Sequence, residues 1–225
     1  GELAGLLQAV LAEACPGEAA SVLAAAEAFV AEGAPQESLA AGRVAVLDDV
    51  FGRLRPRVTL EIGSGSGCSC ARAAAWAQSG GGHVVTIEAD PVRAAVARCI
   101  LELACLTAEV TSIVGQPEDG VRAAVGAIGG LPVDVLLLHG GVEAQCLAVL
   151  EQIEGLGILA EDCVVVVDHA LWPGAPRLLW RMCSTRAYDV ELVSVTESGA
   201  SEGGGEDWVA LCSRRGGAAP GGAAR

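Results

Sequence analysis

From Val58 onward the chain alternates between two hydrophobic patterns. Short, continuous apolar runs predict strands, which lie at 58–62, 83–88, 108–114, 132–138 and 162–167. Between them, apolar residues recur every three or four positions and predict helices near 68–78, 91–105, 117–128, 143–155 and 175–185. Strands that alternate with helices in this way are typical of an α/β fold with a doubly wound, mostly parallel, Rossmann-like sheet.

The hydrophobic pattern differs before this alternating region and at its end. Residues 1–55 carry apolar residues at helical spacing, so they predict a group of N-terminal helices. Near the other end, strand patterns at 190–195 and 208–212 follow one another without a helix between them. Two such strands predict a terminal antiparallel hairpin, which brings the expected sheet to seven strands.

Length and composition indicate one globular domain. The 225 residues are 52% hydrophobic and 19% charged, which suits a chain with a sizeable core. We expect a single domain over residues 1–215, with the Rossmann-like core at 56–215, and a flexible Gly- and Ala-rich tail at 216–225. The apolar runs are too short to cross a bilayer and no signal peptide is evident, so we expect a cytoplasmic protein without a membrane partner.

The turn after the first predicted strand carries the clearest functional signal. It contains Gly63, Gly65 and Gly67, and such a strand–turn–helix unit brings a nucleotide-like ligand close to bare backbone. Glu88 ends the next predicted strand, where an acid can accept hydrogen bonds from a ribose diol. A dinucleotide fingerprint would need glycine at the position of Cys68. Gly63-x-Gly65-x-Gly67, preceded by Glu61, instead resembles the S-adenosylmethionine loop of class I methyltransferases, and this resemblance favours that cofactor over NAD. A tight turn that binds nothing is the weaker alternative.

Net charge limits the classes of partner that we expect, and the cysteine pattern indicates the redox state of the thiols. The net charge of −14 makes nucleic acid a poor partner, because phosphate binding needs a basic surface. Nine cysteines without framework spacing indicate reduced thiols rather than disulfides. All 14 basic residues are arginines, so the chain contains no lysine. The oligomeric state is not encoded in any motif, and a monomer is the simplest expectation.

Residues 5–213 resemble the catechol O-methyltransferases. The segments that carry the resemblance are 16–23, Leu60–Gly63, Val85–Glu88, Ile113–Gly115 and Trp172–Pro176, and the last, with its Pro-Gly-Ala-Pro run, is the most specific. The resemblance implies an S-adenosylmethionine-binding domain over 1–215. It also implies magnesium-dependent transfer of a methyl group from this cofactor to one hydroxyl of a catechol or a similar small aromatic.

The resemblance further assigns residues to the cofactor and the substrate. It places the cofactor against residues that end the first four strands or open the following helices: Glu61, Gly63, Gly65, Gly67, Ser69, Glu88, Ala89, Gly115, Gln116, Pro117, Glu118 and His139. Pro117 and Glu118 stand where the family has a serine and a glutamine. Trp172 and Pro173 would wall the substrate pocket, and Glu197 would hold the second catechol hydroxyl.

The chemical centre departs from the family pattern. Family members hold the metal with an aspartate after the fourth strand and an Asp-Asn pair after the fifth, and they use a lysine as general base. In this chain the fourth strand ends at His139 and the fifth at Asp168 and His169. One aspartate and two imidazoles form a poorer site for magnesium than for zinc, iron, nickel or manganese.

Three hypotheses for this centre follow. His139, Asp168 and His169 hold a divalent metal, with Glu143 as a further possible ligand. Alternatively, His139 or His169 acts as general base in a metal-independent methyl transfer to another small acceptor, with Asp168 beside it. Lastly, the domain has lost catalysis and serves as a cofactor-binding or interaction module. Histidines at strand ends are also common as purely structural, hydrogen-bonded residues.

Overall fold

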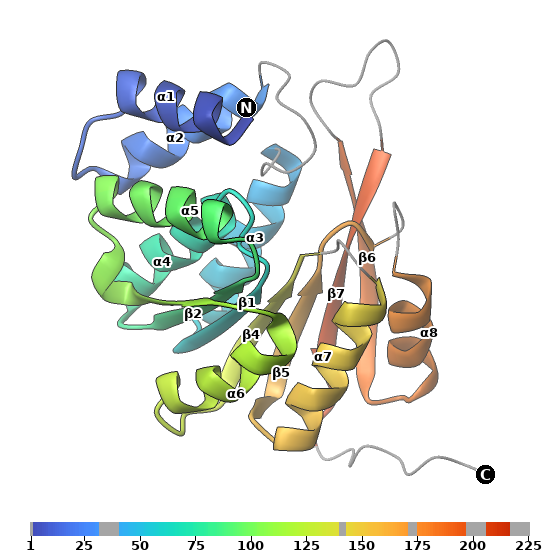
Figure 1. The fold of residues 1–225 in the computed structure, drawn as a ribbon. Helices are drawn as coiled ribbons and strands as arrows, with labels where there is room; N and C mark the ends of the chain where they lie inside the picture. Colours follow the sequence, from blue (N-terminus) through green and yellow to red (C-terminus); the bar gives the residue numbers. More distant parts are fainter. Residues whose placement is uncertain (1, 32–40, 140–142, 171–174, 197–205, 217–225) are drawn as a thin grey trace.

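The computed structural model describes residues 2–31, 41–139, 143–170, 175–196 and 206–216 (Figure 1). Its centre is a seven-stranded sheet in the order β3-β2-β1-β4-β5-β7-β6. The strands are β1 (Val58–Ile62), β2 (His83–Glu88), β3 (Val110–Val114), β4 (Val133–Leu138), β5 (Leu159–Val167), β6 (Tyr188–Thr196) and β7 (Glu206–Arg214). Strands β1 to β5 pair in parallel, whereas β7 pairs antiparallel with both β5 and β6. The expected Rossmann-like sheet and terminal hairpin are confirmed.

Helices cover both faces of the sheet (Figure 1). One apolar core joins the sheet to α1 (Glu2–Glu13), α2 (Ala19–Ala31), α3 (Ala41–Leu54), α4 (Cys68–Gly80) and α5 (Pro91–Leu103). A second core joins the opposite face to α6 (Pro117–Ala127), α7 (Glu143–Leu156) and α8 (Pro176–Ser184). This layering explains why the central strands are apolar on both faces. Within the described residues, none of these helices has the length and hydrophobicity needed to cross a bilayer.

Some element boundaries differ from the sequence prediction. Strand β3 begins at Val110 rather than 108, because Thr107–Glu109 forms a 3₁₀ turn that leads into it. Strand β5 begins at Leu159 rather than 162, because Leu159 already pairs with Val133 before an irregularity in the register. Both hairpin strands are also longer than predicted, because their pairing with one another extends from Tyr188 to Thr196.

The carboxyl ends of the parallel strands meet at one edge of the sheet and position the site. Backbone hydrogen bonds between neighbouring strands continue past the strand ends. The N–H of His139 donates to the carbonyl of Ile62, and the N–H of Asp168 donates to the carbonyl of Leu138. Strand β7 runs in the opposite direction, with Ala210 opposite Val167. The first residues of β7 therefore lie at the same edge as the last residues of β5.

Candidate functional site

The glycine turn after β1 has the conformation that its sequence predicts. Gly63, Gly65 and Gly67 have φ values of +85°, +53° and +87°, which residues with a side chain rarely adopt. A Cβ atom added at Gly67 would lie 2.5 Å from the Cα and Cβ atoms of Ala97 on α5. The glycine at 67 therefore allows α4 to begin directly after the turn and to pack closely against α5.

Glu88 anchors this turn from the neighbouring strand. The backbone N–H of Gly65 donates to its Oε2 at 2.9 Å, and the N–H of Asp90 donates to its Oε1 at 2.9 Å. A carboxylate oxygen has two lone pairs, so each oxygen retains one for a further donor. The residue predicted to receive a ribose diol thus lies against the glycine turn with acceptor capacity remaining.

The end of β3 continues the same surface. The backbone N–H of Gly115 donates to the carbonyl of Glu88 at 2.9 Å, and a Cβ atom added at Gly115 would meet no atom within 4 Å. Gln116 precedes the first turn of α6, where Pro117 is buried and Glu118 is exposed. Ala89 is also exposed. The open space beside Gly115 suits a planar group such as adenine, whose binding here stays a prediction.

Near the end of β1, the buried carboxylate of Glu61 accepts several hydrogen bonds. The hydroxyls of Ser69 and Thr86 each donate to it at 2.6 Å, and Nε2 of His139 lies 3.1 Å from Oε1. Burial alone would raise the pKa of Glu61, but its bonds to the His139 ring and the two hydroxyls hold that pKa below its usual value. Glu61 and Ser69 are both buried, so any cofactor contact through their side chains also stays a prediction.

His139 lies between two carboxylates. Its Nε2 faces Glu61, and its Nδ1 is 3.6 Å from Oδ2 of Asp168. Burial alone would lower the pKa of the ring, but the two acids raise it to about 10. Because His139 is therefore protonated at neutral pH, it serves as a fixed positive charge and is a poor proton acceptor.

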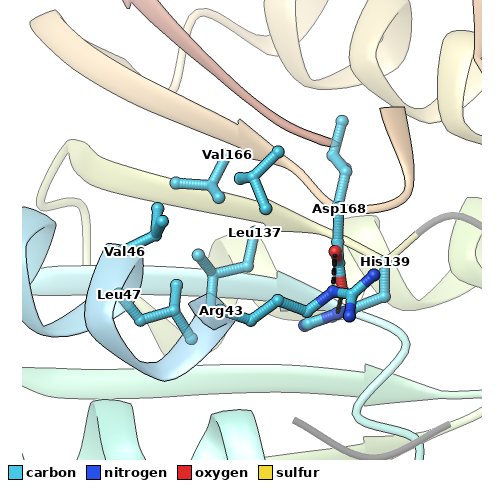
Figure 2. Close-up of a pocket in the computed structure, with 9 residues that line it drawn as sticks. Arg43, Val46, Leu47, Leu137, His139, Val166 and Asp168 are labelled. Atoms are coloured by element: carbon cyan, nitrogen blue, oxygen red, sulfur yellow. Dashed lines mark hydrogen bonds and ion pairs between the residues drawn. The ribbon is translucent and has the colours of Figure 1, made fainter. Parts of the chain in front are cut away.

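Asp168 is paired on its other side with Arg43 of α3 (Figure 2). The guanidinium Nε lies 2.6 Å from Oδ1 of Asp168, and its Nη2 contacts the carboxylate of Asp207 on β7. Burial would raise the pKa of Asp168, but His139 and Arg43 hold it well below its usual value. Alternating charges thus link Glu61, His139, Asp168, Arg43 and Asp207 across the site.

Two members of this chain of charges, Arg43 and Asp207, were not predicted from the sequence. Arg43 lies one helical turn before Leu47 and two before Val50, both buried, and this spacing could have indicated an inward-facing arginine. Asp207 opens an antiparallel strand and so reaches the edge where the parallel strands end. Its position could be derived only from the direction of β7.

His169 completes the site. Its Nδ1 lies 2.6 Å from Oδ2 of Asp207 and 3.1 Å from Nη2 of Arg43. One ring nitrogen cannot both accept from the guanidinium and donate to the carboxylate, and the shorter, charge-assisted contact assigns the proton to Nδ1. His169 also has a φ of +51°, and its backbone N–H donates to Asp168 at 2.8 Å. Strained backbone of this kind is common at functional sites.

The remaining predicted residues separate into two groups. Trp172, Pro173 and Glu197 lie outside the described residues, and Glu143 begins α7 with its side chain outside them. His83 lies at the start of β2, where its Nε2 is 2.8 Å from the hydroxyl of Thr111.

A small cavity of about 10 Å³ adjoins Arg43, His139 and Asp168, and it has room for about one water molecule (Figure 2).

The acidic centre does not fit a resident divalent metal. Asp168, His169 and Asp207 each offer a donor atom within 4.8 Å of the others, so Asp207 joins the predicted set where His139 was expected. The guanidinium of Arg43, however, already binds both carboxylates. A metal ion bound there would lie in contact with a buried positive charge, which is strongly unfavourable.

Known proteins with similar sequences are methyltransferases. Catechol O-methyltransferase B of Danio rerio is 27% identical over 183 residues, which cover 81% of this chain and 69% of that protein. The Bos taurus enzyme named catechol O-methyltransferase is 29% identical over 174 residues, 77% of this chain and 63% of that protein. This chain is similar in sequence to the catechol O-methyltransferases. It spans about two thirds of the length of these relatives, and no family model matches it.

Solved structures show the same fold. Cofactor-bound Rv0187 from MTB has a TM-score of 0.69 and 25% identity, covering 88% of this chain and 90% of that one. An O-methyltransferase from Bacillus cereus in complex with SAH also has a TM-score of 0.69, at 20% identity, covering 93% and 90%. The second likeness concerns the fold alone. Both structures share the architecture of this chain.

Proposed function

We propose that this chain is an S-adenosylmethionine-dependent O-methyltransferase that methylates a hydroxyl of a catechol or similar small aromatic without a metal. The observation that carries the proposal is the His169–Asp207 pair, whose Nδ1–Oδ2 distance is 2.6 Å, at the edge of the sheet that also holds the glycine turn. An imidazole oriented by a carboxylate is the usual form of a protein general base. The similarity to catechol O-methyltransferases supports the choice of acceptor.

The cofactor would occupy the surface formed by the turn after β1, Glu88 and Gly115. Glu88 would accept the ribose hydroxyls, and the open space beside Gly115 would receive the adenine. When bound, S-adenosylmethionine supplies a methyl carbon activated by a sulfonium centre. The protein contributes mainly the position of the acceptor relative to that carbon, which is worth several kcal/mol of the barrier.

His169 would remove the proton of the acceptor hydroxyl. With Nδ1 protonated toward Asp207, Nε2 carries the free lone pair, and it lies 3.9 Å from Oδ2 of Asp168. The hydroxyl proton would move to Nε2, and the oxygen lone pair would form the new bond to the methyl carbon. The carbon–sulfur bond would break at the same time and leave its electron pair on the sulfur, which becomes a neutral thioether. The carboxylate of Asp207 stabilises the resulting imidazolium. His139, held positive by its two acids, favours the negative charge that develops on the acceptor oxygen.

Cofactor binding and methyl transfer can be measured separately. Calorimetric titration with S-adenosylmethionine tests the first, and product formation from dihydroxybenzoate in EDTA tests the second. We expect His169→Gln to keep cofactor affinity and to lose activity roughly 10²–10⁴-fold. His83→Gln, on a histidine bonded to Thr111 at the far end of β2, is the matched control.

The alternatives predict different results. Activity that EDTA abolishes and Mg²⁺ restores would replace the histidine mechanism by a metal-dependent one. Cofactor binding without turnover of any hydroxylated aromatic would identify a cofactor-binding module. Absence of cofactor binding would leave the resemblance confined to the fold.

A further inference from the structure

We propose that Arg43 takes the place of a divalent cation in this protein and excludes a metal ion from its acidic centre. The guanidinium makes two contacts with the group that could otherwise hold a metal: Nε with Asp168 at 2.6 Å, and Nη2 with the Asp207 carboxylate. Together with His169, whose Nδ1 faces Asp207, these two aspartates are the residues whose donor atoms lie within 4.8 Å of one another. Arg43 thus lies where a shared cation would be bound.

The fold commits Arg43 to this position. Its side chain is 3% exposed and lies on the face of α3 that buries Leu47 and Val50, so it has no route to solvent comparable to that of Arg53 on the same helix. A buried guanidinium without partners would be strongly destabilising. Nε and Nη2 form one edge of a rigid planar fork, which suits two carboxylates held side by side. Figure 2 shows the side chain extending from α3 toward Asp168 and His139.

Removal of this positive charge should expose a metal site. Two carboxylates and one imidazole would then face each other without a counter-charge at the position of the guanidinium. Such mixed oxygen and nitrogen donors suit Mn²⁺ and Zn²⁺. Arg43 is therefore a positioning residue. Its contacts fix the positions of the Asp168 and Asp207 carboxylates, and its side chain is too buried to touch a substrate.

The test is calorimetric titration of the folded chain with Mn²⁺ and with Zn²⁺ alone. We expect no saturable binding to the wild type and one site per chain in Arg43→Met, with an affinity at least 100-fold above any wild-type signal. Adding Asp168→Asn to Arg43→Met should abolish this site. The matched control is Arg72→Met, because Arg72 also bridges two acids, Glu27 and Asp48, away from the centre. The control should bind no metal at these concentrations.

Two results would overturn the assignment. One is stoichiometric metal binding by the wild type that Asp168→Asn removes, and the other is a folded Arg43→Met protein that binds neither ion. Should Arg43→Met fail to fold by circular dichroism, Arg43→Gln replaces it, since its amide can still donate to one carboxylate. Because this role of Arg43 rests on the proposed metal-free reaction but is measured by ion binding, a failure of methyl transfer alone would leave it standing.

Discussion

Nε2 of His139 lies 3.1 Å from Oε1 of Glu61 and thereby connects the end of β4 to the end of β1. The contact is more than a surface ion pair, because Glu61 is fully buried. The positive charge of His139 therefore stabilises the folded state, because the protonated ring helps to keep the buried carboxylates of Glu61 and Asp168 ionised.

This arrangement predicts a specific loss of stability at alkaline pH. The pKa of His139 rises from an ordinary value of 6.5 to about 10 on folding, so its stabilisation is complete below pH 6.5 and is lost as the pH rises toward 10. We expect the free energy of unfolding of the wild type to fall by a few kcal/mol across this interval. Denaturant unfolding of wild type and His139→Gln from pH 6 to 10 measures it.

His139→Gln should have a lower free energy of unfolding than the wild type, and this free energy should change less with pH over the same interval. His83→Gln should retain the wild-type slope, because it leaves the contacts of His139 with Glu61 and Asp168 in place. Parallel slopes for wild type and His139→Gln would show that His139 is not the group that titrates.

A second prediction concerns the orientation of His169. Asp207→Asn replaces an acceptor by an amide that can donate to Nδ1, which moves the ring proton to Nε2 and removes the lone pair that serves as base. We expect kcat to fall roughly 10²–10⁴-fold, with the affinity for S-adenosylmethionine little changed. Steady-state kinetics and calorimetry on the same preparation provide both values.

Asp189→Asn is the matched control for this substitution. Asp189 is an exposed aspartate of β6 that pairs with Arg215, so its loss should change kcat less than twofold. If Asp207→Asn were as active as this control, His169 would not be the base.

The sequence alone predicted the fold and some of the residues that the structure brings together in the candidate site. Alternating apolar runs fixed the parallel strands, and the rule that ligands bind at their carboxyl ends pointed to Glu88, His139, Asp168 and His169. Arg43 could not be found by that rule, because it comes from an N-terminal helix whose alanines and leucines resemble ordinary packing. Its partner Asp168 is 125 residues away in the chain.

The roles of the histidines also needed the structure. From the sequence, His139 and His169 were equivalent candidates for base or metal ligand. Their partners distinguish them: His139 lies between two acids and is held positive, whereas His169 pairs through Nδ1 with one. Which acids a strand-end histidine meets depends on side-chain direction, which hydrophobic periodicity does not specify.

A third prediction tests the cofactor surface. Glu88→Gln keeps the size of the side chain but removes the charge that would accept the ribose hydroxyls, so we expect the Kd for S-adenosylmethionine to rise about 10- to 100-fold. Calorimetric titration measures it. Glu102→Gln, on an exposed acid of α5 that pairs with Arg98, should leave Kd unchanged. Equal affinities for both variants would place the ribose away from Glu88.

The last prediction concerns the structural role of Gly67 in the glycine turn. Gly67 has a φ of +87°, and a Cβ atom there would lie 2.5 Å from the backbone of Ala97. Gly67→Ala should therefore force α4 away from α5 and cost on the order of 2–4 kcal/mol of unfolding free energy. Gly80 is the last residue of α4, the helix that follows Gly67, and a Cβ atom there would meet no atom within 4 Å, so Gly80→Ala should be neutral or slightly stabilising. Urea unfolding of both variants compares them directly, and an equal stability would mean that the close contact of α4 with α5 is not what requires glycine at position 67.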